Sequence, residues 1–393
     1  MNTVKCYKFR LYPTKAQEAL FLSFAGCRRF VWNWALARKQ AVYKETGKSI
    51  SSNDLCRELT ILKKQPETAF LAEAPNASLQ QALRDLDAAY SAFFAKRTRY
   101  PRFKSRKRTP HAFRFPEYAK VLQNAVQLPK IGRVKAVIHR QPEGVLKSAT
   151  VKQEAGAWYV VFVAHVELPD VPATCSNPVG LDVGLESFVT LSDGEKVTPP
   201  KFYRKAEKKM ARLQRQVSRC QKQSNRRQKA KARLARFHAR VTNQRKDFLH
   251  NLSARIVREF DTLCIEDLNL NGLVKTKLAK SFSDAALGEF LQQLQYKAQW
   301  RGGQVVKVGR FYPSSKTCYT CGSKQALILS QRRWTCEGCG GQHDRDTNAA
   351  QNILREGLRT VAVMTTDTQN AHGAEVRPAT VGTRRRSEKL CKK

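Results

Sequence analysis

The chain has 393 residues, of which 41% are hydrophobic, and its 72 Lys and Arg against 32 Asp and Glu give a net charge of +40. This hydrophobic fraction excludes an intrinsically disordered chain, and no uncharged run approaches the ~20 residues of a membrane span. The charge excess is spread over several long segments, which favours a nucleic-acid partner over a ribosomal-type or membrane-surface protein. The N-terminus lacks the apolar segment of a signal peptide, so we expect a cytoplasmic or nucleoid location.

The N-terminal part of the chain predicts a strand followed by helices. Residues 3–11 have the composition of a strand, and Thr14 with Gln17 forms a capping-box pattern at the start of a helix. Two further ranges predict helices, 51–58 and 76–95. Apolar residues recur at helical spacing in the first helix, and we interpret them as core rather than as a base-stacking surface: Leu20, Phe24, Cys27, Val31 and Trp34.

The segment 96–108 carries eight basic residues and no acid, with Tyr100 and Phe103 interleaved. It is either a solvated charge run or a loop that grips a nucleic-acid backbone, and the interleaved aromatic residues favour the loop. Its candidate nucleic-acid contacts are Arg99, Arg102, Lys104, Arg106 and Lys107.

Residues 110–170 change to short β-rich runs, and a hairpin turn is predicted across residues 154–156. The strand at 3–11 is expected to join this β domain, with the helical region inserted between. After a linker-like stretch, the remaining predicted elements are two strands around Gly184 in 179–194, a buried strand at 262–267, a helix at 283–300 and a strand at 304–309.

Residues 201–246 hold eighteen Lys and Arg and a single acid, Glu207. Only a thin apolar stripe accompanies these charges, so we predict long basic helices or a helical hairpin. The cations of this segment are candidates for gripping a nucleic-acid backbone, in particular Arg226, Arg227 and Lys229.

Two CxxC pairs stand fourteen residues apart: Cys318 with Cys321, and Cys336 with Cys339. Zn²⁺ prefers tetrahedral thiolate coordination, and each CxxC turn offers two sulfurs to one ion. Eleven cysteines in a chain without a secretion signal argue against disulfides. The spacing therefore predicts a structural zinc ribbon with these four ligands. A redox CxxC lacks its usual sequence context, and His343 is not needed as a ligand.

Three separated carboxylates form a second constellation. Asp182 lies in a predicted strand, Glu266 ends another, and Asp346 opens a helix behind the ribbon. An acid in an apolar strand is costly unless it is paired or binds a metal. Ordinary alternatives stay open, because the strand acids can pair with a buried Arg and Asp346 can cap its helix. As a set, they resemble the RNase H-type or RuvC-type nuclease site, where carboxylates hold two Mg²⁺ ions for phosphodiester hydrolysis.

Neighbouring residues compete for these roles. Strand alternation places Asp267 on the face opposite Glu266. Asp344 is expected to have a turn role, pairing with Arg345 or another nearby Arg, and Asn348 to orient Asp346 or a bound water.

Together the motifs resemble the TnpB family of transposon-encoded, RNA-guided DNA nucleases, which are related to the type V CRISPR effectors. The resemblance covers about residues 1–360 in order, and its segments are YKFRLYPT, YPRFKSRK, GLDVGLESFVTLSDG, IEDLNLNGL, LQYKAQWRGGQVVKVGRFYPSSKTCYTCG and CGGQHDRDTNAAQNIL.

The resemblance implies an α/β multidomain fold: an RNase H-like (RuvC) nuclease domain with an inserted zinc ribbon, plus a β-barrel-like wedge domain with an inserted helical recognition domain. The implied bounds are 1–12 and 100–170 for the wedge, 13–99 for the recognition domain, 175–313 and 343–360 for the RuvC domain, and 314–342 for the ribbon. Residues 361–393 are expected to be a basic, disordered tail.

The resemblance also assigns the chemistry. It implies Asp182, Glu266 and Asp346 as catalytic ligands of Mg²⁺, structural Zn²⁺ on the four cysteines, and a guide RNA from the transposon end. The implied partner is double-stranded target DNA with a short adjacent motif, which is cut after R-loop formation. We expect a prokaryotic cell and favour a monomer, while the sequence leaves the oligomeric state open. The alternatives are an RNA-guided DNA-binding regulator, which the three acids argue against, a DNA transposase or its accessory protein, and a plain nucleic-acid-binding zinc protein.

Overall fold

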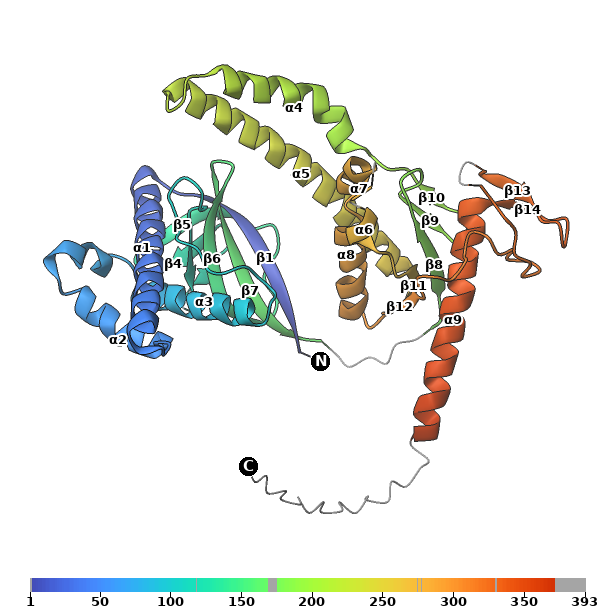
Figure 1. The fold of residues 1–393 in the computed structure, drawn as a ribbon, viewed down its shortest axis with the longest axis horizontal. Helices are drawn as coiled ribbons and strands as arrows, with labels where there is room; N and C mark the ends of the chain where they lie inside the picture. The colour runs from blue at the N-terminus through green and yellow to red at the C-terminus, as the bar shows by residue number, and fades with distance from the viewer. Residues whose placement is uncertain are drawn as a thin grey trace, which may run out of the picture. The chain divides into compact units, whose positions relative to one another are not determined.

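A computed structural model describes residues 2–117, 119–168, 175–273, 275–276, 278–328 and 331–371, with side chains except those of 271 and 364–371. The chain divides into two compact units. The first comprises residues 1–170 and 206–244, and the second comprises residues 171–205 and 245–393, as far as they are described. Each unit combines a sheet with helices (Figure 1), which confirms the predicted α/β multidomain class.

The first unit is built on a seven-stranded antiparallel sheet with the order β2-β6-β7-β1-β5-β4-β3. Its strands are β1 (Asn2–Tyr12), β2 (Ala112–Phe115), β3 (Lys120–Val121), β4 (Ala125–Leu128), β5 (Gly132–Val137), β6 (Val145–Glu154) and β7 (Ala157–Glu167). The N-terminal strand β1 pairs with both β5 and β7, so its predicted place in the β domain is confirmed. Ala155 and Gly156 both have positive φ, the geometry of a two-residue hairpin turn, as predicted.

Four helical elements lie between β1 and β2 in the chain: α1 (Lys15–Thr46), α2 (Ser52–Leu62), the 3₁₀ helix η1 (Pro66–Ala72) and α3 (Asn76–Phe94). The capping box at the start of α1 is present, because Thr14 and Gln17 each accept a hydrogen bond from the other's backbone N–H. The buried face of α1 packs on the sheet, where the ring of Phe21 meets Phe113 and Trp158 edge-on. The predicted stripe is thus core.

Two long helices, α4 (Phe202–Arg219) and α5 (Asn225–Glu259), form the predicted basic hairpin (Figure 1). The turn between them is held by Arg227, whose Nη1 donates to the carbonyl oxygen of Cys220 at 2.8 Å.

The second unit is built on a five-stranded mixed sheet with the order β10-β9-β8-β11-β12. Its strands are β8 (Pro178–Val183), β9 (Val189–Leu191), β10 (Lys196–Val197), β11 (Thr262–Glu266) and β12 (Gln304–Val308). The strands β8, β11 and β12 are parallel, and β9 and β10 are antiparallel additions. On one face, Leu181 and Ile265 share a core with α5 and α8 (Leu287–Trp300).

The other face of this sheet is covered by α9 (Arg345–Ala371), which lies directly on the strands. A Cβ atom at Gly180 would lie 2.0 Å from the carbonyl oxygen of Ala350, and one at Gly357 would lie 2.3 Å from the Sγ of Cys264. Only glycine permits these approaches. Because side chains alternate along a strand, the next residues on the α9 face after Gly180 and Cys264 are Asp182 and Glu266.

Two predictions for the second unit are wrong. The helix expected over 283–300 is α7 (Ala279–Ala285) followed by α8, separated by Ala286 in the left-handed conformation with a φ of 53°. The helix α9 continues to Ala371, so residues 361–371 are helical rather than disordered, and Val361 still packs on the core around Ile353. The rest of the expected tail, 372–393, lies outside the described residues.

The substitution Gly180→Ala is expected to destabilise the second unit by about 1–3 kcal/mol, because the added methyl group meets helix backbone that cannot turn aside. Thermal unfolding followed by circular dichroism measures the change. Gly309→Ala is the matched control, since a Cβ there meets no atom within 4 Å, and its effect should stay within about 0.5 kcal/mol. Equal melting temperatures for the two variants would contradict the direct packing of α9 on β8.

Candidate active site and cysteine cluster

Two of the predicted acids lie at the carboxyl ends of neighbouring parallel strands. Leu181 of β8 pairs with Ile265 of β11, so Asp182 and Glu266 are neighbours one residue further along. Both side chains belong to the sheet face that α9 covers. The carboxyl edge of parallel strands is where open α/β sheets place their binding sites.

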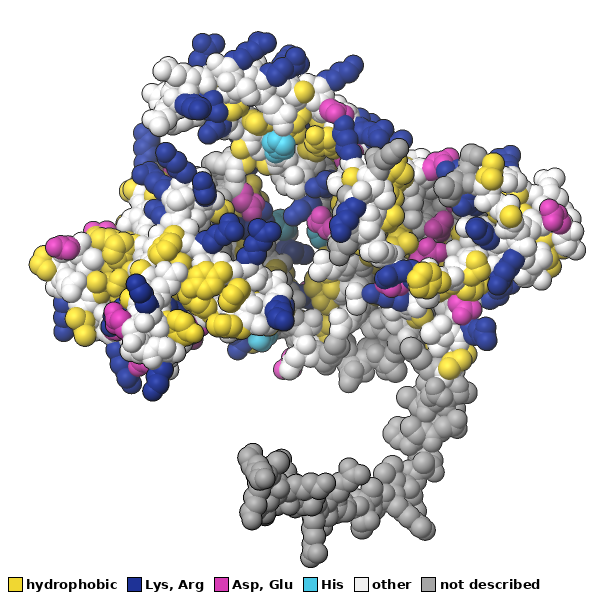
Figure 2. Space-filling model, in the orientation of Figure 1, with side chains coloured by type: hydrophobic (Ala, Val, Ile, Leu, Met, Phe, Trp, Pro, Cys, Tyr) yellow, Lys and Arg dark blue, Asp and Glu magenta, His cyan; other side chains and the backbone are white. Residues whose placement is uncertain are grey.

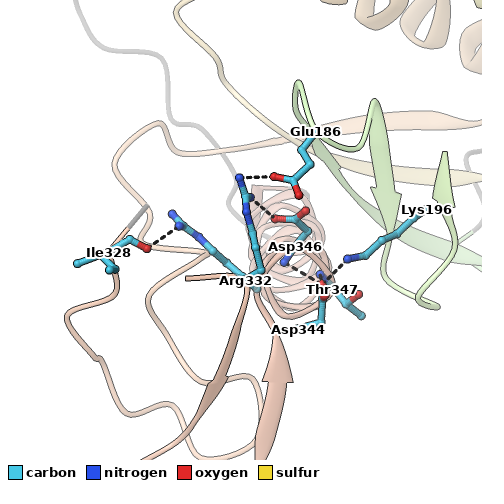
Figure 3. A network of polar contacts seen from close by, with 8 residues as sticks. Glu186, Lys196, Ile328, Arg332, Asp344, Asp346 and Thr347 are labelled. Atoms are coloured by element: carbon cyan, nitrogen blue, oxygen red, sulfur yellow. Dashed lines mark hydrogen bonds and ion pairs between the residues drawn. The ribbon is translucent and has the colours of Figure 1, made fainter. Parts of the chain in front are cut away.

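The third acid lies in the first turn of α9. Asp344 provides the cap, because its Oδ1 accepts hydrogen bonds from the backbone N–H of Asp346 at 3.2 Å and of Thr347 at 3.1 Å. Asp344 also pairs with Lys196 at 2.6 Å (Figure 3), rather than with the Arg that we expected. Since Asp344 satisfies the helix terminus, the carboxylate of Asp346 is left for another role.

The three carboxylates act on one another electrostatically. Burial, together with the negative charges of Glu266 and Asp346, raises the pKa of Asp182 to about 7. The positive charges of Arg345 and Arg332 oppose this rise. The charges of Glu266 and Asp346 therefore both act on Asp182, and their repulsion is only partly offset by the two arginines.

Arg332 is a site residue that the sequence analysis missed. Its Nη1 lies 3.5 Å from the Oδ1 of Asp346, and its Nη2 forms an ion pair with Glu186 (Figure 3). The sequence carried no spacing that distinguishes Arg332 from the other basic residues of the ribbon.

Asp182, Asp346 and Arg332 line a cavity of about 320 Å³, and Glu266 is not part of this lining. Thr190 lines it as well, directly opposite Asp182 in the β8–β9 pair. The hydroxyl of Thr190 is buried and has no hydrogen-bond partner in the described part of the chain. Carboxylates are the hard oxygen ligands that Mg²⁺ prefers. The unpaired Thr190 hydroxyl could form a hydrogen bond with a water molecule bound to the ion. The residues present therefore fit Mg²⁺.

Glu266 is held in place by Ser314, a second residue that the sequence analysis missed. Ser314 is a buried residue, 6% exposed, and its hydroxyl donates to the Oε1 of Glu266 at 2.5 Å. The carbonyl oxygen of Ser314 accepts from the Nδ2 of Asn352 in α9 at 2.9 Å. The helix that carries Asp346 thus also fixes the residue that orients Glu266. Asp267 instead pairs with Arg310 at 2.7 Å, in keeping with its expected orientation.

The four predicted cysteines form one cluster, with sulfur atoms all within 4.8 Å of one another. The Sγ atoms of Cys318 and Cys339 are 3.8 Å apart, and those of Cys321 and Cys336 are 3.5 Å apart. A tetrahedral site with Zn–S bonds of about 2.3 Å requires sulfur separations of about 3.8 Å. The cluster therefore fits Zn²⁺. His343 is a neighbour of the cluster, with its Nε2 3.1 Å from the Sγ of Cys318.

The cysteine cluster is joined to α9 by two buried asparagines. Asn348 donates to the carbonyl oxygen of Thr317 at 2.7 Å and accepts from the N–H of Tyr319 at 2.9 Å. Asn352 donates to the same Thr317 oxygen at 2.6 Å. Asn348 was expected to orient Asp346, but its amide binds the backbone on either side of Cys318 instead.

The candidate nucleic-acid contacts of the 96–108 loop are not equivalent. Four are exposed, namely Arg99, Arg102, Arg106 and Lys107. Lys104 differs, because its ammonium group lies 3.2 Å from the centre of the Trp32 ring, and burial lowers its pKa to about 8. Lys104 thus helps to anchor the loop on α1, together with a hydrogen bond from the Trp32 ring N–H to the carbonyl oxygen of Arg102.

On the basic hairpin, Arg226 and Lys229 are exposed, whereas Arg227 forms a hydrogen bond that holds the turn. Arg226 and Lys229 line a cavity of about 660 Å³ with Arg219 and Arg233, and no acid belongs to its lining. Lys and Arg side chains are spread along the hairpin at the top of Figure 2. The hairpin therefore presents a surface suited to phosphate groups.

Within the described ranges, no helix is both long enough and apolar enough to cross a bilayer.

Three family models match the chain: a probable transposase domain over residues 145–277, a Cas12f1-like TNB domain over 288–353 and a helix-turn-helix domain over 1–48. The model of the TNB domain spans the cysteine cluster and Asp346.

The chain is similar to full-length relatives. It is 42% identical over 370 residues to a Streptomyces pristinaespiralis protein named as an RNA-guided DNA endonuclease, with 92% of each chain covered. It is 36% identical to the RNA-guided DNA endonuclease InsQ of Escherichia coli K12, covering 92% of this chain and 94% of the relative.

The fold is similar to that of a solved Cas12f1–sgRNA–target DNA complex, with a TM-score of 0.50, 14% identity, and coverage of 90% of this chain and 99% of that one. This likeness supports the fold assignment. With both relatives matching over most of their length, the predicted resemblance is confirmed, and the chain belongs to the TnpB family.

Proposed function

We propose that this protein is an RNA-guided DNA endonuclease, and that Asp182, Glu266 and Asp346 are its catalytic carboxylates. The observation that carries the proposal is the convergence of these acids from β8, β11 and α9 on one site in a member of this family. A regulator that only binds DNA would have no need to hold three mutually repelling carboxylates together.

The three carboxylates would hold two Mg²⁺ ions, which lower the pKa of the attacking water and stabilise the leaving oxygen of a phosphodiester. Asp182 would contribute a carboxylate ligand from the sheet, and Asp346 would contribute one from the start of α9. Glu266 would contribute the third, in the orientation that its hydrogen bond with Ser314 sets. Arg332 faces Asp346 and is suited to meet the negative charge of the scissile phosphate.

For the cysteine cluster, we propose a structural Zn²⁺ ion. Four thiolates fill a tetrahedral shell and leave no open position for chemistry. The ion would fix the backbone at Thr317 and Tyr319, where the asparagines of α9 bind.

The polyanionic partners would be a guide RNA from the transposon end and double-stranded DNA with a short adjacent motif. In RNA-guided recognition, base pairing supplies sequence specificity while the protein grips backbone, which suits a net charge of +40. We propose that Arg99, Arg102, Arg106, Lys107, Arg226 and Lys229 contribute to this grip. The domain bounds given above for the wedge, recognition, RuvC and ribbon parts belong to the same proposal.

Alanine at Asp182, Glu266 or Asp346 is expected to slow DNA cleavage by at least about 100-fold without loss of RNA binding, because each removes a cation ligand. The assay is cleavage of a plasmid library with randomised flanking sequence by protein co-expressed with the transposon end. Asp267→Ala is the matched control beside Glu266, and Asp344→Ala, which removes the cap of α9 but no proposed cation ligand, should lose much less activity than Asp346→Ala. An uncut library, with RNA bound and Mg²⁺ present, would refute the proposed function, and a larger loss at Asp344 than at Asp346 would refute the residue assignment.

Ser314→Ala is expected to raise the Mg²⁺ concentration needed for half-maximal cleavage by about tenfold, because Glu266 loses the hydrogen bond that orients it. Ser314→Thr keeps a hydroxyl and should recover most of the activity. Ser315→Ala is the control, since the described residues give its hydroxyl no hydrogen bond. Mn²⁺ binding followed by electron paramagnetic resonance gives a readout apart from activity. Equal cation affinity for Ser314→Ala and Ser315→Ala would show that Ser314 does not position Glu266.

Cys336→Ser is expected to abolish the binding of about one Zn²⁺ per chain and to lower the melting temperature, because the metal site would lose a ligand. Elemental analysis of the purified protein and thermal unfolding measure the two effects. Cys220→Ser, outside the cluster, should retain both the metal and the melting temperature. A wild-type protein that purifies without metal and gains no stability from added Zn²⁺ would contradict the assignment.

A further inference from the structure

A second cavity adjoins the acid site within the same unit. It measures about 320 Å³ and shares three wall residues with the cavity of Asp182 and Asp346: Leu185, Glu186 and Arg332. The ion pair between Glu186 and Arg332 therefore borders both cavities. A polymer strand that passes over the acids has this second cavity beside it.

The lining of the second cavity combines apolar surface with positive charge. Its apolar part includes Phe188, Pro199, Pro200, Phe248 and Leu278, and its cations beyond the shared Arg332 are Lys201, Arg204 and Arg245. Apolar faces suit a nucleobase, and guanidinium groups suit a phosphate. This is the combination that one nucleotide of a single strand requires.

The two arginines retain hydrogen-bond donors for a ligand. Arg245 donates from Nη1 to the carbonyl oxygen of Ser283 at 3.2 Å, and its Nε–H is buried without a partner in the described part of the chain. Arg204 donates from Nη2 to Ser281 at 2.8 Å. Among the described residues, neither forms an ion pair. The remaining Nη groups of both arginines have no acceptor among the described residues, and a phosphate oxygen can accept hydrogen bonds from them.

The cations in the walls outnumber the acids, with Lys201, Arg204, Arg245 and Arg332 against Glu186 and Asp284. The two carboxylate oxygens of Asp284 accept the backbone N–H groups of Tyr203 and Arg204 at the start of α4. Glu186 is paired with Arg332. Lys201, Arg204 and Arg245 are left as the positive side of the cavity.

We infer that this cavity is a subsite for the DNA strand being cut, and that it takes one nucleotide beside the scissile phosphate. Its base would lie against the apolar wall near Phe248, and its phosphate would bind Arg204 and Arg245. DNA is the occupant because the strand that crosses the neighbouring acids is the one that is cleaved. The inference rests on the proposed function, and it adds the residues that set where the strand is cut.

The test uses the full-length protein with its guide RNA and a matching plasmid, and compares wild type with Arg204→Gln and Arg245→Gln. Permanganate footprinting measures R-loop formation, single-turnover kinetics measure cleavage, and end sequencing maps the cut positions. We expect unchanged R-loop formation, cleavage slowed by about tenfold, and cut ends scattered over several positions. A residue needed only for folding would not move the ends.

Arg258→Gln, an exposed cation of the same helix α5, is the matched control and should cut at the wild-type rate and position. If Arg245→Gln lowers the melting temperature, Arg204→Gln, at an exposed side chain, keeps the test decisive. Variants that cut at the wild-type rate and position would overturn the subsite alone. A wild type that forms an R-loop and never cuts would overturn the proposed function and the subsite with it.

Discussion

The candidate active site depends on one steric constraint, the direct contact of α9 with the nuclease sheet. Gly180 and Gly357 lie where a Cβ would collide with helix backbone or with the Cys264 side chain. Any larger residue would move the helix outward by the width of a methyl group, and Asp346 would move with it. The same contact fixes the two strand acids, because Asp182 and Glu266 follow Gly180 and Cys264 on the face that α9 covers.

A second set of interactions connects α9 to the rest of the site through hydrogen bonds. Asn348 and Asn352 bind the backbone next to Cys318, and Asn352 also binds Ser314, which orients Glu266. These amides are buried, so each lost hydrogen bond leaves an unsatisfied polar group that costs about 1–3 kcal/mol. The cysteine cluster is therefore connected to the predicted acids through main-chain hydrogen bonds and α9.

Much of this arrangement could be predicted from the sequence, because the strongest signals are local. The capping box at Thr14, the CxxC spacing and the alternation around Asp182 are each set by a few neighbouring residues. The roles of Ser314, Thr190 and Arg332 could not be predicted, because they arise where strands and α9 meet. The extension of α9 to Ala371 was missed for a similar reason: its packing through Val361 is tertiary, and the local pattern there is weak.

We propose that Asp182, Glu266 and Asp346 form a single divalent-cation site held together by α9. A crystal of the protein soaked in Mn²⁺, with anomalous difference density measured at the manganese edge, tests it most directly. We expect an anomalous peak in contact with Asp182 and with at least one of Glu266 and Asp346. Anomalous density on Asp344 or Asp267 instead would contradict the proposed cation site. Mn²⁺ bound elsewhere, with no density at the three acids, would contradict it as well.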